Sequence, residues 1–232
     1  MNTLSIFTKL QRHLLACCFL LMSVMTVNVA HAQKEDDFFK AVAFDNVEKV
    51  ALYIEQGYSP NLQEKVRGES ALMVAIREQS ERVFLLLMTH KKIDFEVKAN
   101  NGDTALMLAA YLKQSKMLTF LIEHGARVNQ DGWTALHYAA ASAEPEMVQI
   151  LLAHNAKMDA LSPNHSTPLM MAIRSASLDI VKLLVARGAN IELKNQVGMM
   201  ALDFAVYYEQ RDIQAYLKSL QKSLQKSLQK TQ

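Results

Sequence analysis

A short motif recurs along this chain at an interval close to 33 residues. It consists of Ser or Thr, then Ala or Pro, then Leu, with a weaker copy at Met200-Ala201-Leu202, and its successive leucines are separated by 34, 30, 33 and 33 residues. The leucines are Leu72, Leu106, Leu136, Leu169 and Leu202. Regular self-similarity is typical of arrays whose units cannot bury an apolar face alone, so that neighbours bury it jointly. The period therefore predicts an all-α solenoid of about six helix pairs.

Each copy reads as two short helices. The Ser or Thr of the motif can cap the free amides of the first helix. Pro168 and Pro145 suit the first position of a helix. Gly125, Asn155 and Gly188 are residue types that end a second helix in the left-handed conformation. We expect copies at residues 36–65, 66–98, 99–130, 131–160, 161–193 and 194–221.

The repeats resemble the ankyrin family. Residues 131–140 read DGWTALHYAA, very close to the family signature, and residues 148–156, VQILLAHNA, complete that copy. The resemblance covers residues 36–221. It implies a curved stack of helix pairs with β-hairpin loops on one side, a role in protein binding, and no enzymatic activity.

Two departures from the ankyrin pattern have structural consequences. Where the family usually has Gly between paired helices, this chain has Asp45, Gln79, Lys113, Ala143, Ala176 and Glu209. If these positions remain left-handed, each costs roughly 1 kcal/mol relative to Gly. The loop near residues 126–133 is about three residues shorter than its counterparts. It should leave a notch in the row of loops and move Trp133 toward the concave surface.

The first 32 residues are expected to be a secretory signal. Lys9 and Arg12 precede an uncharged apolar stretch that closes on Ala30-His31-Ala32, which predicts cleavage after Ala32 and a periplasmic location. An uncleaved anchor is the alternative. Residues 33–221 would form the repeat domain, and residues 222–232 a tail of KSLQ repeats that is either a frayed helix or a partner-binding helix. The predicted mature chain has 23 basic and 23 acidic residues and no cysteine. This balance gives no general affinity for nucleic acid, and disulfides and cysteine-ligated metals are excluded.

No pattern for catalysis is apparent. The chain has no HExxH, no phosphate-binding loop and no nucleophile elbow. No two histidines of the mature chain have metal-site spacing, and Met73, Met107 and Met170 recur at one repeat position, as packing residues do. Met170-Met171 and Met199-Met200 leave a copper-binding alternative open. We expect no cofactor, no metal and no enzymatic activity.

The resemblance also implies a binding surface, because ankyrin proteins contact partners through loop tips and the exposed ends of the first helices. The corresponding residues are Arg67, Glu69, Arg77, Glu78, Asn101, Asp103, Tyr111, Leu112, Trp133, Asn164, Arg174, Tyr207 and Tyr208. Trp, Tyr and Arg are enriched at interface hot spots. We expect a monomer that binds another protein and does not insert into the membrane once its signal is removed. The sequence is similar to exported bacterial ankyrin proteins, some linked to oxidative-stress protection. The alternative function is an immunity protein that neutralises a toxic effector delivered to the periplasm.

Overall fold

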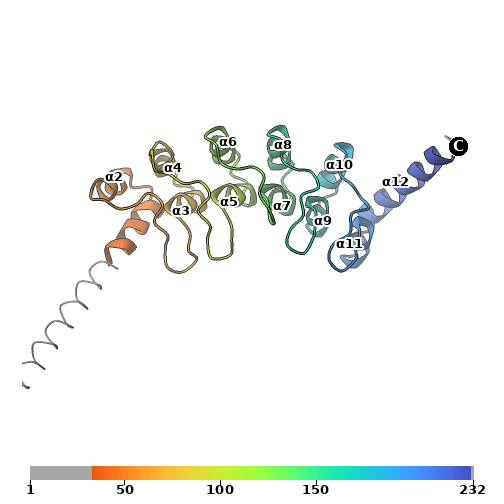
Figure 1. The fold of residues 1–232 in the computed structure, drawn as a ribbon, viewed down its shortest axis with the longest axis horizontal. Helices are drawn as coiled ribbons and strands as arrows, with labels where there is room; N and C mark the ends of the chain where they lie inside the picture. Colours follow the sequence, from red (N-terminus) through yellow and green to blue (C-terminus); the bar gives the residue numbers. More distant parts are fainter. Residues whose placement is uncertain (1–32, 231–232) are drawn as a thin grey trace, which may run out of the picture.

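A computed structural model describes residues 33–230, which form a row of helix pairs (Figure 1). The first helix spans residues 33–43. The others are α2 (Val47–Glu55), α3 (Ala71–Arg77), α4 (Glu81–Met88), α5 (Ala105–Tyr111), α6 (Ser115–Glu123), α7 (Ala135–Ala141), α8 (Pro145–Ala153), α9 (Pro168–Arg174), α10 (Leu178–Ala186), α11 (Ala201–Tyr207) and α12 (Arg211–Lys230). Each predicted copy contains one pair. The all-α solenoid is confirmed, and the predicted signal with its cleavage site lies outside the described residues.

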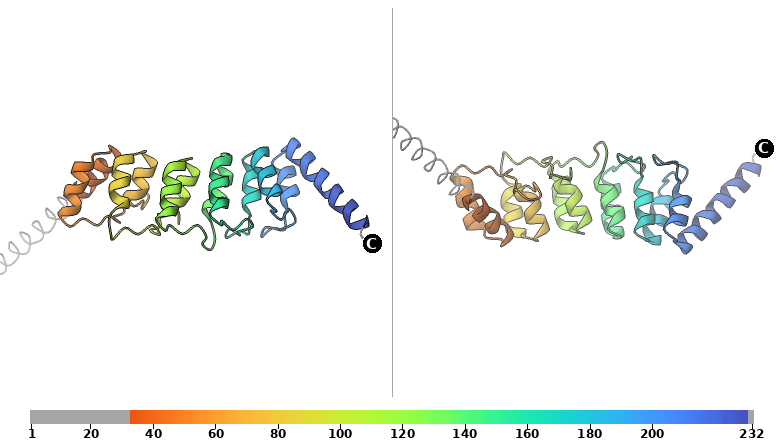
Figure 2. Two further views of the ribbon diagram at one scale, coloured as in Figure 1. Left: turned by 90° about the horizontal axis from the view of Figure 1, so that it is seen from above. Right: turned by 90° about the horizontal axis from the view of Figure 1, so that it is seen from below.

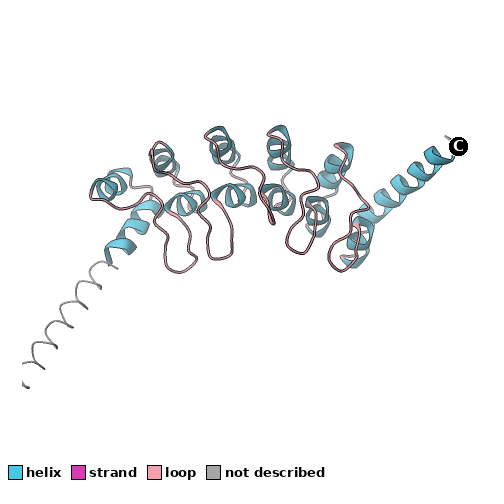
Figure 3. Cartoon of the chain, in the orientation of Figure 1, coloured by secondary structure: helices cyan, strands magenta, loops and turns pink. Residues whose placement is uncertain are grey.

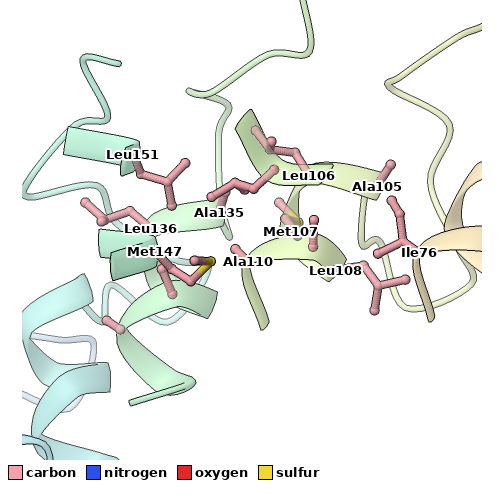
Figure 4. Packing of buried hydrophobic residues seen from close by; sticks show 14 of the residues in the cluster. Ile76, Ala105, Leu106, Met107, Leu108, Ala110, Ala135, Leu136, Met147 and Leu151 are labelled. Atoms are coloured by element: carbon pink, nitrogen blue, oxygen red, sulfur yellow. The ribbon is translucent and has the colours of Figure 1, made fainter. Parts of the chain in front are cut away.

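The helices lie in two rows. The inner row holds α3, α5, α7, α9 and α11 beside the long loops, and the outer row holds α4, α6, α8 and α10 (Figure 1). The core runs between the rows along the whole array. Figure 4 shows its central part, with labelled residues from Ile76 to Leu151. The alanine three positions after each motif leucine is fully buried in all five copies, at Ala75, Ala109, Ala139, Ala172 and Ala205. Because a methyl group is small, neighbouring inner helices can pack closely there.

The methionines at the recurring repeat position are core residues. Met73, Met107 and Met170 are 1–2% exposed. Their backbone amides donate to the capping hydroxyls of Ser70, Thr104 and Thr167 at 3.3, 3.5 and 3.3 Å. Packing and helix capping therefore account for this position, as its periodicity predicts.

The left-handed conformation is kept at every predicted non-glycine position. The φ angles at Asp45, Gln79, Lys113, Ala143, Ala176 and Glu209 lie between 53 and 62°. Asn155 and His165 adopt it as well, with φ of 61 and 58°. The turns between paired helices thus retain the ankyrin geometry without its glycines.

The long loops are less regular than the predicted β-hairpins. Figure 3 draws them as loops, and in the described part of the chain the only ladder-type pairing is an isolated antiparallel bridge between Gln63 and Ser70. Each loop reverses direction by turns, since glycines and Asx-type contacts replace the ladder. Two pairs of adjacent loops are joined through the backbone. The Asn100 amide donates to the Arg67 carbonyl at 2.8 Å, and the Gln196 amide to the Asn164 carbonyl at 2.9 Å.

The short loop before α7 interrupts this row, as predicted. It ends well above the tips of its neighbours in Figure 1. Within residues 33–230, no backbone hydrogen bond joins it to the loop on either side. The missing residues therefore leave a gap in front of α7.

The last helix continues beyond the array. Ile213 and Leu217 of α12 are 2% and 1% exposed and pack into the core, but the second half of α12 projects from the end of the row (Figure 2). The helix is unbroken at residue 221, so the KSLQ segment extends the last repeat helix. No helix among the described residues has the length and apolar character needed to cross a membrane.

Candidate protein-binding surface

The predicted contact residues lie along the inner helices and loops, with different degrees of exposure. Those exposed are Arg67, Glu78, Asn101, Tyr111, Asn164, Arg174, Tyr207 and Tyr208. Those half-buried are Arg77, Asp103, Leu112 and Trp133, and Glu69 is buried. The three tyrosines stand out, because Tyr111 is 51% exposed, Tyr207 70% and Tyr208 37%. The surface therefore carries several accessible aromatic groups, as its residue types predict.

The short loop leaves a hollow at the centre of this surface. The hollow has a volume of about 330 Å³ and is lined by residues of α5, α7, α9 and the short loop: Tyr111, Trp133, His137, Tyr138, Ala141, Met171, Arg174 and Ser175. Tyr138 is central, since its ring meets those of Tyr111 and Trp133 edge to face at centroid distances of 6.1 and 6.2 Å. Edge-to-face pairs hold aromatic groups in fixed orientations. The hollow is thus a pre-formed aromatic pocket facing solvent.

A carboxylate and a guanidinium lie near this pocket. The Tyr138 hydroxyl donates a hydrogen bond to one carboxylate oxygen of Asp103. The other oxygen accepts from the side-chain amide of Asn101 at 2.7 Å. Burial, followed by the neighbouring Asp103 carboxylate, raises the pKa of Tyr138, so its hydroxyl stays neutral and keeps donating. Arg174 is exposed and forms no ion pair within the described chain. The pocket therefore combines aromatic walls with the guanidinium of Arg174, while Asp103 holds the hydroxyl of Tyr138.

His137 holds the base of the pocket in place. Its Nε2–H donates to the carbonyl of Ser166 in the next copy at 3.0 Å, and its Nδ1 accepts from the Thr134 amide at 3.2 Å. Its ring lies 5.2 Å from that of Trp133 at 79°. Burial lowers the pKa of His137 to about 4, so it is neutral at pH 7. The neutral imidazole is buried and hydrogen-bonded at both ring nitrogens. It therefore holds Trp133 in place and fixes the fourth copy relative to the fifth.

Glu69 is part of the scaffold of the surface. Its carboxylate forms a two-pronged ion pair with Nε and Nη2 of Arg77, and its side chain is 5% exposed. The nearby Glu64 carboxylate accepts from the amides of Val66, Glu69 and Arg67. Burial alone would raise the pKa of Glu64, but these donors outweigh it and lower the pKa. Glu69 and Glu64 therefore fix the second loop, and Arg67 and Glu78 remain exposed beside it.

Several exposed apolar residues escaped the sequence prediction. Phe44 is 83% exposed, Val66 84% and Val197 76%. Phe44 directly precedes a left-handed residue, as the predicted contacts Leu112 and Tyr208 do, so alignment by register could have identified it. Val66 and Val197 lie in exposed loop tips, where an apolar side chain gains nothing from burial in the core. Their exposure extends the apolar surface toward both ends of the array.

The described chain offers no other evident chemistry. Residues 33–230 contain no group of three or more His, Asp or Glu side chains that could hold a metal ion. The copper-binding alternative included Met170 and Met171, which are buried in the core at 1% and 4% exposure. The Met170 sulfur also accepts a hydrogen bond from the Thr167 backbone amide at 3.4 Å. A hydroxyl that lies beside an imidazole, Thr134 Oγ1 at 2.9 Å from Nδ1 of His137, belongs to the cap of α7, where both residues are buried.

Comparison with known proteins agrees with this architecture. A family model described as ankyrin repeats (3 copies) matches residues 38–131, 83–162, 128–195 and 157–227. Relatives include human transient receptor potential cation channel subfamily A member 1, 26% identical over 66% of this chain. Protein glp-1 of Caenorhabditis elegans is 26% identical over 84%, and the mouse B-cell lymphoma 3 protein homolog 28% over 73%. The matches cover 14%, 16% and 39% of these relatives. The chain thus spans less than half of each of them.

Proposed function

The chain belongs to the ankyrin-repeat family, and we propose on that premise that it is an exported scaffold that binds one protein of the cell envelope or periplasm. Ankyrin repeats imply a protein-interaction scaffold, and the fold provides one continuous surface of inner helices and loops. Binding would use the concave side of the array together with the loop tips.

The observation that carries the proposal is the aromatic pocket at the notch. Tyr111, Trp133 and Tyr138 converge on it from α5, the short loop and α7, and Arg174 lies at its side. Interface hot spots are enriched in Trp, Tyr and Arg and cluster near the centre of the contact area. Because the pocket is pre-formed, binding there requires little ordering of side chains. An apolar side chain of the partner, with a carboxylate near Arg174, fits this combination.

The cellular setting is the finer part of the proposal. Export is supported by the pattern of residues 1–32 and by the lack of cysteine after residue 32, which suits an oxidising compartment. The similarity to exported bacterial ankyrin proteins suggests that the partner contributes to oxidative-stress protection. A periplasmic effector, with this chain as its immunity protein, is the other outcome that the experiment distinguishes.

The first experiment is crosslinking in intact cells. The exported chain would carry a C-terminal tag, and the Trp133→Ala, Tyr111→Ala double variant should lose the partner while its circular dichroism stays helical. Trp133 contacts His137, so a second variant, Tyr111→Ala with Arg174→Glu, tests the pocket without removing that packing. The matched control removes exposed apolar area elsewhere, at Leu52 and Leu85 of α2 and α4.

The outcomes separate the alternatives. One dominant partner that both pocket variants lose and the control retains supports the proposal. A secreted toxin as that partner indicates an immunity protein, and an envelope enzyme or stress protein indicates a scaffold. Equal recovery with the pocket variants refutes the assignment of the binding site. Retention of the chain in the cytoplasm refutes export.

A further inference from the structure

The second half of α12 differs in charge from the rest of the chain. Residues 218–230 contain four lysines, Lys218, Lys222, Lys226 and Lys230, and no acidic residue. Of the 25 basic residues, two precede residue 33 and four lie in this segment, which leaves 19 against 23 acidic residues in 33–217. An array with excess negative charge thus ends in a helix that carries only positive charge.

The spacing of these lysines makes the helix unfavourable by itself. Each lies four residues from the next, and like charges four apart are neighbours on a helix and repel. No carboxylate in the segment offsets the repulsion. Pairing with the same segment of a second copy would bring four more lysines close, so self-association through this segment is also disfavoured. A surface that supplies negative charge would offset the repulsion between these lysines.

An apolar stripe runs along the same segment. Ile213 and Leu217 are buried against the array, and Leu220 is half-buried at its edge. Leu224 and Leu228 continue this series at intervals of four residues. The lysine positions are offset from the leucine positions by two residues, about 200° of helical rotation at 3.6 residues per turn. By register, leucine and lysine positions therefore fall on different faces of α12.

We propose that residues 218–230 of α12 bind the surface of an anionic lipid bilayer and lie in the plane of the interface. A helix with a leucine face, a lysine face and low overall hydrophobicity is suited to this position. Anionic lipids relieve the repulsion between lysines, and each lysine near the surface strengthens binding. The segment lacks Trp, Tyr and Arg, the residue types that anchor shaped protein interfaces. Repeated Leu, Lys, Ser and Gln suit a fluid surface without fixed shape better than a folded acidic partner. The array, with its excess of acidic residues, would be held away from the lipid.

The test is vesicle flotation of the chain that begins at residue 33. Among the described residues the buried core lies between Phe38 and Leu217, so the chain that begins at residue 33 retains it and avoids a second apolar segment. The chain should float with vesicles of phosphatidylcholine mixed with phosphatidylglycerol and remain unbound to phosphatidylcholine alone. High salt should release it. Lys222→Gln with Lys226→Gln should weaken partitioning roughly 30-fold, from the contribution expected of two lysines.

Two variants make the result specific. Exchange of residues 224 with 225 and 228 with 229 keeps composition and charge but moves two leucines off the stripe, and it should reduce binding. Lys116→Gln with Lys157→Gln removes two exposed lysines from the array and should leave binding unchanged. Equal flotation with both kinds of vesicle, flotation with neither, or full binding by the exchanged variant would overturn the proposal. So would capture of an acidic protein by the tail without vesicle binding.

Discussion

Replacing Ala143 and Ala176 with glycine should stabilise this protein. Both residues adopt a left-handed backbone, each with φ of 58°, in the turns that join α7 to α8 and α9 to α10. Both side chains are exposed, so their removal costs no core packing. In this conformation the Cβ atom crowds the following carbonyl oxygen, which glycine avoids.

The expected gain combines two opposing contributions. Relief of the left-handed strain gives about 1.5 kcal/mol per site. The greater freedom of glycine in the unfolded chain removes about 0.7 kcal/mol of this. The net gain is about 0.8 kcal/mol per site, or about 1.6 kcal/mol for the double variant, because the two turns share no partner. For a chain of this size the double variant should melt about 3–6 °C higher. Urea denaturation followed by circular dichroism measures the free energy directly.

A matched substitution provides the control. Ala215 is exposed within α12, where the backbone is helical, and Ala215→Gly should destabilise by about 1 kcal/mol. The same chemical change is thus predicted to have opposite signs at positions of opposite backbone handedness. Asp45→Gly should gain little, because the Asp45 carboxylate accepts from the Val83 amide at 2.7 Å and the substitution removes that contact. A double variant that is neutral or destabilised would refute the argument from strain.

Three further predictions concern polar groups in and near the surface. The pKa of His137 is about 4 in the folded state and about 6.5 in an unfolded chain, so the unfolded state binds more protons between these values. Stability should fall by up to about 3 kcal/mol as pH drops through this window, and urea melts of a His137→Gln variant should show a shallower dependence. Arg77→Leu leaves the Glu69 carboxylate buried without its main partner and should cost about 2 kcal/mol. The Arg77→Leu, Glu69→Leu double variant should lose less free energy of unfolding than Arg77→Leu alone. A larger loss for the double variant in a double-mutant cycle would contradict this. Tyr138→Phe removes a hydrogen-bond donor to Asp103 and should lower the free energy of unfolding by about 1 kcal/mol. Unchanged thermal stability of this variant would contradict the prediction.

The fold could be predicted from the sequence because the same physical requirement is repeated in each copy. Four units bury the motif leucine and place Ser or Thr at the start of the first helix, and all five motif copies bury the alanine, so agreement between copies makes the pattern readable even where one copy diverges. The left-handed turns were anticipated only as a condition, because the positions lack glycine, and the structure shows φ between 53 and 62° at all six. The loops are less regular than the expected β-hairpins. The described residues contain one isolated bridge, and single backbone hydrogen bonds, such as Ala99 to Asp103 and Asn195 to Met199, close other loops.

The surface was only partly predictable because exposed residues obey no such repeated constraint. Glu69 resembles a solvent-facing residue in sequence, yet Arg77, eight residues later, folds back and covers it. That contact depends on where the second loop lies relative to α3, which no local pattern encodes. Phe44 was missed although Asp45 aligns with the other left-handed positions, a register that places Phe44 with Leu112 and Tyr208.

The short loop and the aromatic pocket follow from one feature of the chain. A loop of the usual length before α7 would extend as its neighbours do and occupy the space in front of Tyr138. Because it is about three residues shorter, it draws Trp133 against His137 and Tyr138 and leaves the rings of Tyr111 and Tyr138 open to solvent. The loop forms no backbone–backbone hydrogen bond to either neighbour. It is still held on both sides, because the Arg127 amide donates to Glu96 at 2.8 Å and Asn129 bonds to Asn155 and Lys157 at 2.8 and 2.7 Å. The His137–Ser166 hydrogen bond adds a further link between the fourth and fifth copies. Aromatic rings that the short loop leaves exposed contribute less to stability than buried rings would, and this is the physical reason to place the centre of binding at the notch.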